Sequence, residues 1–315
     1  MRAERHLSYT EKMTDEHRKQ KLNGKQIRDL GVAWPYLVIP THLTTLKPLC
    51  RYLHTVIHDF FLLQFNVKFG FKKIEVIPVD HPLDDEIPFD PEKSDTYLDF
   101  IHFWIRPLTL IIKRFGVKRA LPHCARFMQA LYQAYREAAR MYKFRMSTTA
   151  RPPAGDNKNL KTIHLLDPHF LCVPSLHISV VILTFSFFAD VFNRERLPED
   201  EARRYNEELY RGAVEIAETV LYLKQHSVNC IPAAVYMMIH LQPALFSIEQ
   251  ATAFIDTLFN GADDVSAAAK KRITEHIHYM LDRLILEGCA EDDWLVPVQR
   301  WILQYQKQTA AGRSE

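Results

Sequence analysis

The sequence predicts an all-α fold built as a helical bundle. Apolar residues recur at helical spacing, as Phe127, Leu131, Tyr135 and Ala138 do. The 315 residues include only 9 glycines, too few for a turn-rich sandwich or a glycine-rich nucleotide fold. Alternation of the kind that strands show is weak and confined to residues 74–79. A chain of this length can bury a sizeable hydrophobic core.

Stretches of helical periodicity between prolines and glycines place the individual helices. Asp95 is typical of an N-cap for a helix that ends near residue 115, and Ser175 is typical of one for a later helix. Prolines and polar residues predict long loops at 76–97 and 146–174. In chain order, the helices expected before residue 240 are 49–65, 95–115, 122–142, 175–192, 198–225 and 228–239.

Three regions follow from these elements. Residues 1–29 are charged throughout and predict a polar N-terminal arm. Residues 30–247 predict the main helical domain. Residues 248–315 predict a C-terminal helical extension, in which three or four amphipathic helices are separated by breaks near 256–264 and 288–293.

Charge and motif content exclude several classes of function. The net charge is only +2, and the basic residues between positions 2 and 25 are mixed with acids, which is typical of a solvated helix; no nucleic-acid partner is expected. Neither GxGxxG nor GxxxxGK(S/T) occurs, so no dinucleotide or P-loop site is expected. The five cysteines form no CxxC pair and no signal peptide opens the chain, which favours the cytoplasm.

Membrane association is a separate question, because a spanning helix needs about 20 mostly apolar residues. The stretches 98–110, 176–192 and 231–246 come near, but each is short or interrupted by charged residues, histidine or proline. The sequence therefore favours a soluble or membrane-associated protein over a multi-span one. Its aromatic and basic elements leave peripheral membrane contact open. The C-terminal helices are expected either to pack against the main helical domain or to mediate homo-oligomer formation.

The sharpest local pattern is Pro174-Ser175-Leu176-His177 at the start of an apolar helix. A serine at a helix N-terminus caps free backbone N–H groups, and the same N–H groups and the helix dipole suit an anion. His177 in the first turn would lie beside that anion. The alternative is an ordinary capping serine with a core histidine.

Two further patterns carry candidate site residues. His226 is flanked by apolar helical sequence, where a histidine is either functional or a core residue with its hydrogen bonds satisfied. Lys143, Arg145 and Arg151 surround the end of a predicted helix and the start of a loop. Clustered Lys and Arg can clamp a phosphate, or they can form a solvated helix end.

Taken together and in this order, the three patterns resemble the type 2 phosphatidic acid phosphatase / vanadium haloperoxidase superfamily. That family has Lys, six residues and Arg-Pro; then Pro-Ser-x-His; then Ser-Arg, five residues, His, three residues and Asp. Residues 174–177 match the second motif in full, and Arg151-Pro152 matches the end of the first. The run from Asp167 into this motif is similar to the inositol phosphorylceramide synthase branch. The resemblance covers about residues 80–240.

The chain departs from the family pattern at four positions. Counting from His226, the family's serine and arginine are Thr219 and Val220, and its aspartate is Cys230. The family's first lysine is Phe144, which lies between Lys143 and Arg145. A phosphate-clamping arginine and the carboxylate that would orient His226 are therefore missing.

The resemblance implies a metal-independent phosphatase or phosphotransferase that acts on a phosphate monoester, and it implies no cofactor. His226 would attack phosphorus to form phosphohistidine, and His177 would protonate the leaving alkoxide and then activate water. Arg151 and Ser175, with Lys143 or Arg145, would neutralise the phosphoryl oxygens. The implied partner is a phosphorylated small molecule or lipid.

Two other hypotheses remain open at this point. In the first, the missing groups make the chain a degenerate member that binds a phosphorylated ligand without turnover. In the second, the same residues hold vanadate in a haloperoxidase. A metal site is not predicted, because the nearest candidate group, His164, Asp167 and His169, lacks convincing metal-ligand spacing.

Overall fold

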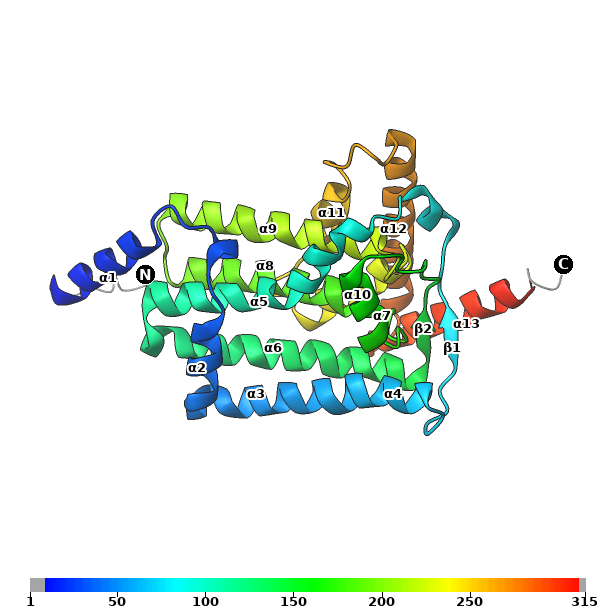
Figure 1. Cartoon of the computed structure of the whole chain (residues 1–315), viewed down its shortest axis with the longest axis horizontal. Coiled ribbons are helices and arrows are strands. Elements are labelled where there is room, and N and C mark those ends of the chain that lie inside the picture. Colours follow the sequence, from blue (N-terminus) through cyan, green and yellow to red (C-terminus); the bar gives the residue numbers. More distant parts are fainter. Residues whose placement is uncertain (1–8, 312–315) are drawn as a thin grey trace.

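The computed structural model of the chain describes residues 9–311 and confirms the all-α prediction (Figure 1). Four long helices run side by side through its centre. They are α5 (Ser94–Phe115), α6 (Val117–Phe144), α8 (Leu176–Arg194) and α9 (Glu199–Tyr222). Each corresponds to a helix expected from the sequence, with bounds that differ by a few residues. Gly116, with φ at +80°, adopts the left-handed conformation that ends α5 and lets the chain turn back into α6.

Helix α8 forms the centre of the bundle. Almost every side chain along it is buried, including Val180, Val181 and Phe188. Within the described residues it is the one helix long and apolar enough to cross a membrane, and 78% of its apolar window is buried inside the fold. A buried core helix of a bundle can have the same length and apolar composition as a membrane span.

A second layer covers α6 along the lower edge of Figure 1. It consists of α2 (Ala33–Thr41) and a continuous rod made of α3 (Leu43–Thr55), a π-helical segment (Val56–Leu62) and α4 (Leu63–Lys68). The rod begins before and ends after the helix expected at 49–65. It can begin before residue 49 because Pro48 is accommodated within α3.

The predicted polar arm contains a helix, α1 (Tyr9–Leu22), that packs on α5. Arg18 donates a hydrogen bond of 3.1 Å to the carbonyl oxygen of Phe115, and Asp15 accepts one of 2.8 Å from Arg114. Residues 1–8 of the arm lie outside the described residues.

The C-terminal region contains α11 (Ile248–Thr257), α12 (Ala267–Gly288) and α13 (Leu295–Ala311), with breaks where the sequence predicts them. Helix α12 packs against α10 (Cys230–Leu241), and α13 packs against α6 and the first strand. Figure 1 shows α12 standing across the long axis of the bundle. The extension thus shares one continuous hydrophobic core with the main helices.

Two short strands close one end of the bundle. Strand β1 (Val76–Pro78) lies within the stretch of weak alternation at 74–79 and pairs in parallel with β2 (Met146–Thr148). The segment 170–172 continues this arrangement, since Ser147 N donates to Phe170 O and Cys172 N donates to Ser147 O. The loop expected at 146–174 also holds α7 (Lys158–Leu166), a helix that the sequence reasoning did not predict.

Candidate active site

Two histidines from distant parts of the chain meet at the start of α8. His177 Nδ1 lies 3.2 Å from His226 Nε2, and Ser175 Oγ lies 3.2 Å from the same nitrogen. Ser175 and His177, two of the residues expected to act with His226, therefore both contact it. His226 and Ser175 are buried, and His177 is partly buried.

The start of α8 positions the first two of these groups. Ser175 is the N-cap, and its Oγ accepts a hydrogen bond of 3.4 Å from Ile178 N. Tyr142 donates a hydrogen bond of 2.6 Å from its hydroxyl to Pro174 O, which ties the segment before the helix to α6. His177 then extends from the first turn of α8, where the amide dipoles favour an anion.

A tight turn between α9 and α10 positions His226. Lys224 adopts a left-handed conformation with φ at +54°, and both Gln225 N and His226 N donate to Val220 O. Helix α9 thus ends at Tyr222, three residues earlier than expected. Thr149 Oγ1 donates to Lys224 O at 3.0 Å, which fixes this turn against the end of β2.

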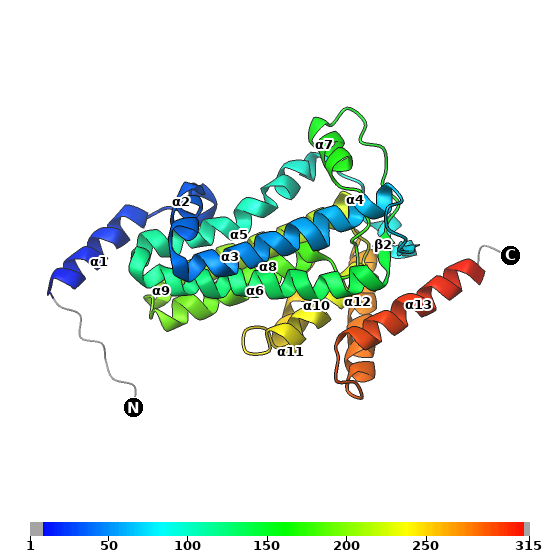
Figure 2. The same cartoon turned by 90° about the horizontal axis from the view of Figure 1, so that it is seen from below.

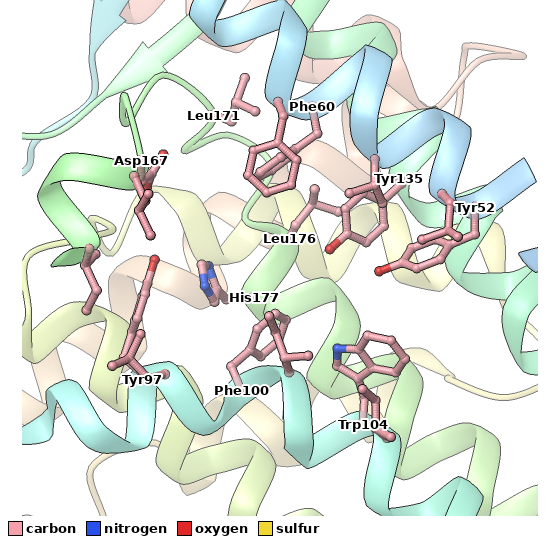
Figure 3. A pocket seen from close by; sticks show the side chains of 18 of the residues that line it. Tyr52, Phe60, Tyr97, Phe100, Trp104, Tyr135, Asp167, Leu171, Leu176 and His177 are labelled. Atoms are coloured by element: carbon pink, nitrogen blue, oxygen red, sulfur yellow. The ribbon is translucent and has the colours of Figure 1, made fainter. Parts of the chain in front are cut away.

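Two aromatic rings of α5 flank the imidazole of His177. The Tyr97 ring centroid lies 4.8 Å from that of His177, and the Phe100 centroid lies at 4.6 Å (Figure 3). These contacts restrict the orientation of the His177 ring. They also remove it from water, which bears on its protonation.

Burial keeps both histidines neutral. Desolvation lowers the pKa of His177 to about 4, and it lowers that of His226 well below the ordinary value. For His226, the adjacent imidazole of His177 acts in the same direction. A neutral imidazole has one nitrogen lone pair available, as nucleophilic or proton-accepting chemistry requires.

The second ring nitrogen of His226, Nδ1, lacks a good hydrogen-bond partner. The Cys172 backbone favours the protonated form, but His226 Nδ1 is buried and makes no hydrogen bond of normal geometry. If Ser175 and His177 donate to Nε2, the proton of His226 resides on Nδ1 and faces no good acceptor. The position where the family pattern has a carboxylate is Cys230, a buried thiol whose Sγ accepts from Ser227 N at 3.4 Å.

Two charged residues that lie close to His226 in the sequence, Glu218 and Lys224, have their partners elsewhere. Glu218 accepts a hydrogen bond of 2.5 Å from Phe259 N, and Lys224 Nζ donates to the carbonyl oxygens of Asp84 and Ile87. Val220, at the arginine position of the family pattern, is fully buried. Neither a carboxylate nor a cation from these positions reaches the histidine pair.

Arg151 reaches the neighbourhood of the pair through the loop after β2. Its Nη1 donates to Gln225 Oε1 at 3.2 Å, and its Nη2 donates to Asp167 O at 3.3 Å. Burial lowers its pKa, although Asp167, Cys172 and Tyr97 favour the charged form. The guanidinium stays cationic at neutral pH because its ordinary pKa is so high.

Lys143 and Arg145 do not join the cluster. Lys143 Nζ pairs with Asp59 at 2.7 Å, and Arg145 Nε lies 3.2 Å from Glu75. Helix α6 continues to Phe144 and presents both side chains to partners on neighbouring elements. The structure thus brings His226, His177 and Ser175 together, holds Arg151 one step away through Gln225 and Asp167, and leaves the two predicted auxiliary cations with other partners.

Asp167 and His169 form a second polar pair near the histidines. Burial alone would raise the pKa of Asp167, but hydrogen bonding from His169 and the charge of Arg151 hold it at about 2. Burial lowers the pKa of His169, and its Nε2 lies 2.7 Å from Thr149 Oγ1. Within residues 9–311, no three His, Cys, Asp or Glu side chains are grouped as ligands for a metal.

A largely apolar groove of about 600 Å³ leads from the surface to the histidine pair. It lies between the α3–α4 rod and α5, with α6 and the start of α8 among its walls, and both His177 and His226 line it. Figure 3 shows Asp167 on one side of His177 and Trp104, Tyr52 and Tyr135 on the other. The arrangement suits a ligand with an apolar chain and one small polar group.

The aromatic walls of the groove were missed by sequence reasoning. Tyr97, Phe100 and Trp104 recur at helical spacing on α5, and this pattern equally predicts an ordinary core face. The adjacent charges of Asp95 and Asp99 gave no signal of a cavity. The N-cap expected at Asp95 was also wrong, because Lys93 is the N-cap of α5 and Asp95 lies in its first turn.

The chain was compared with family models, with curated proteins and with solved structures, and none of them matched.

Proposed function

We propose that the chain is a metal-independent phosphatase or phosphotransferase that acts on a phosphate monoester with an apolar tail. One observation carries this assignment above the others: two neutral imidazoles, His177 and His226, lie with their nitrogens 3.2 Å apart in the lining of an apolar groove. The motif resemblance through Pro174 and His177 supports the same assignment.

The reaction divides into two balanced steps. The Nε2 lone pair of His226 attacks phosphorus, the bond from phosphorus to the ester oxygen breaks, and the departing alkoxide takes a proton from the imidazolium form of His177, which becomes neutral. Water then gives a proton to His177 and attacks the phosphohistidine, and the P–N bond breaks to release phosphate. If an alcohol replaces water, the phosphoryl group is transferred to that alcohol.

Charge stabilisation in this scheme comes from three sources. The first-turn amides of α8 supply hydrogen-bond donors and a dipole, Ser175 supplies a hydroxyl, and Arg151 supplies a guanidinium that can pair with phosphate oxygens. Arg151 already donates to Gln225 and Asp167, so the cation is held before the ligand arrives. Such preorganised donors are the main source of catalysis in phosphoryl transfer.

A second function is favoured by a different observation. His226 Nδ1 has no hydrogen-bond partner of normal geometry, and Cys230 and Val220 pack in the core where the family pattern has an aspartate and an arginine. In serine proteases, replacing the orienting aspartate costs about 10⁴ in rate through the wrong tautomer. A comparable loss here would leave a protein that binds an apolar phosphate ester without turnover.

The experiment that separates the two functions measures turnover with EDTA present. Wild type, His226→Ala and His177→Ala are compared on p-nitrophenyl phosphate and on dioctanoyl phosphatidate, with His278→Ala as the control because its side chain pairs with Asp256 away from the groove. The enzyme assignment requires activity that survives in the control and disappears in both site variants. A radiolabelled phosphate trapped on wild type and not on His226→Ala would identify the nucleophile.

Equal background in all four proteins would refute turnover on these substrates. Binding of dioctanoyl phosphatidate by calorimetry would then decide whether the groove is a ligand site. Retained affinity without turnover supports the second function, and loss of both excludes these ligands.

A further inference from the structure

The groove opens on a face that carries an unusual number of exposed apolar side chains. Among the lining residues, Tyr36, Leu53 and Phe61 are 57%, 44% and 44% exposed. Across the opening, Ile101 of α5 and Leu166 of α7 are 52% and 61% exposed. These five residues come from α2, the α3–α4 rod, α5 and α7, so an apolar rim surrounds the mouth of the groove.

The apolar surface extends beyond the rim along α2 and the α3–α4 rod. Leu37 on α2 and Leu43 at the start of α3 are 66% and 88% exposed. Phe69 and Phe71, just past α4, are 63% and 81% exposed. A rod of residues 43–68 is about 40 Å long at 1.5 Å per residue. Figure 2 shows this rod crossing the front of the molecule, with α2 near one end and α7 near the other.

Basic side chains accompany this surface. Residues 33–73 contain Lys47, Arg51, Lys68, Lys72 and Lys73, all exposed, and none of them has an ion-pair partner within the described part of the chain. The one acid in the same stretch is Asp59, which pairs with Lys143. This stretch of the chain therefore carries a larger net positive charge than the +2 of the whole protein.

Aromatic and basic residues are most concentrated at the end of the rod. The rings of Phe65 and Phe69 stack with centroids 6.0 Å apart, and Phe71 lies 6.4 Å from Phe69. Lys72 and Lys73 follow directly in the sequence. Apolar rings beside lysines are typical of surfaces that insert at the boundary between lipid headgroups and acyl chains.

We propose that this face, defined as the exposed side of α2, the α3–α4 rod to Lys73, and the groove rim on α5 and α7, docks on an anionic lipid bilayer. The apolar rim enters the interface, the five basic residues contact lipid phosphates, and the groove mouth opens directly to the acyl chains. Docking of this kind is peripheral and does not require any helix to cross the membrane.

A second copy of the chain is the main competing occupant. In a two-fold dimer the same patch contacts itself, so each basic residue would face the same excess of positive charge from its partner. Like charges brought together across an interface oppose association. An anionic bilayer matches both the apolar rim and the surrounding charge.

Vesicle co-sedimentation of the full chain tests this docking. The vesicles are pure phosphatidylcholine, and equal parts phosphatidylcholine and phosphatidylglycerol. We expect partitioning into the mixed vesicles that weakens at high salt. Lys68→Glu/Lys72→Glu/Lys73→Glu should partition at least about 100-fold less, since each lysine near an anionic surface contributes about fivefold. Lys21→Glu/Lys25→Glu/Lys118→Glu makes the same change in charge elsewhere and should bind as the wild type does.

The apolar part has its own matched pair of variants. Leu53→Glu/Phe61→Glu on the rim should abolish partitioning, whereas Tyr279→Glu/Leu286→Glu on α12, where the two residues are 64% and 74% exposed, should not. Thermal melts of each variant confirm that these surface changes leave the protein folded. His226→Ala should partition like wild type, so docking is measured independently of any phosphoryl transfer.

Three outcomes would overturn the docking proposal. The first is a wild type that sediments with neither vesicle. The second is an equal loss of partitioning in the two lysine triple variants, which would mean non-specific attraction by net charge. The third is a stable dimer in light scattering that Leu53→Glu/Phe61→Glu dissociates, which would assign the face to a second copy.

Discussion

At the scale of single residues, the histidine pair makes a prediction about pH. His226 must be neutral to attack, and His177 must carry a proton to give to the leaving group. Burial sets the pKa of His177 at about 4, so its protonated fraction is full below that value and falls as the pH rises. The catalytically competent form therefore declines across the range from acid to neutral pH.

We expect kcat/KM for an alkyl phosphate to fall by about tenfold per unit of pH between pH 5 and pH 7. p-Nitrophenyl phosphate supplies the control, because its leaving group departs without a proton and the fall should be shallower. Steady-state rates measured on both substrates across this range give the comparison. Parallel profiles for the two substrates would argue against His177 as the proton donor.

Arg151 makes a second prediction at this scale. Replacing it by Ala removes the guanidinium held by Gln225 and Asp167 beside the histidine turn and should lower kcat/KM by about 10²- to 10³-fold, as loss of a preorganised oxyanion donor does. Arg151→Lys should recover only part of this loss, because an ammonium cannot make the paired hydrogen bonds of a guanidinium.

The matched controls for Arg151 are Lys143→Ala and Arg145→Ala. Their partners are Asp59 and Glu75, so both variants should keep the wild-type rate on the same substrates. A rate loss at Lys143 or Arg145 equal to that at Arg151 would restore the wider phosphate clamp that the sequence predicted.

The residue scale also shows how far the site could be predicted. Ser175 and His177 were predictable because a Pro-Ser-x-His pattern at the start of an apolar run fixes a local geometry of cap and first turn. Their meeting with His226 depends on the turn at Lys224, which is set by long-range hydrogen bonds to Asp84 and Ile87. The positions of Lys143 and Arg145 depend on where α6 ends and which acids lie nearby, and local sequence carries neither fact.

At the scale of elements, long amphipathic helices were predictable and short ones were not. The breaks around 256–264 and 288–293 separate α11, α12 and α13 as expected. Helix α7 was missed although Asn157 caps it with a hydrogen bond of 2.9 Å from Leu160 N. Its 9 residues lie between prolines, and its buried side chains are just Leu160 and Ile163, which pack with Leu223 from the end of α9. Tertiary contact decides such short helices more than local propensity does.

A buried ion pair between α5 and α9 supplies the prediction at this scale. Arg114 Nε lies 2.8 Å from Glu201 Oε1, and their side chains are only 5% and 6% exposed. Replacing one partner leaves a buried charge uncompensated, so Arg114→Leu should destabilise the protein by about 3–5 kcal/mol. Arg114 also donates to Asp15, which links α1 to the same pair.

Urea denaturation of both single variants and the double variant measures the coupling. Arg114→Leu/Glu201→Leu should recover much of the lost stability, because two apolar side chains replace two charges in a dry site. A double variant as unstable as the sum of the single variants would show that each residue acts separately. The control is Arg126→Leu. Arg126 pairs with Asp190 in a more exposed position, so this change should lower the free energy of unfolding by less than about 1 kcal/mol.

At the scale of the whole molecule, the question is whether the C-terminal helices form a separate unit. The sequence suggests an extension that begins at residue 248. In the structure, α12 packs on α10, and Tyr305 on α13 donates a hydrogen bond to Asp80 O beside β1. Ile277 on α12 and Val235 on α10 are both fully buried in the same core. Sequence periodicity identifies an apolar face, but it cannot say which other face covers it.

One cooperative unit predicts one unfolding transition. Ile277→Asp places an unpaired polar group in the shared core and should destabilise the entire chain by more than about 3 kcal/mol, as Val235→Asp should. Tyr279→Asp, two residues away on the same helix and 64% exposed, should be nearly neutral. Calorimetry and circular dichroism should give a single transition for every variant, with the midpoints of the two core variants lowered together. If Ile277→Asp instead lowered an early, separate transition and left the main midpoint unchanged, the C-terminal helices would be an independent unit. The groove and its histidine pair would then fold independently of the C-terminal helices.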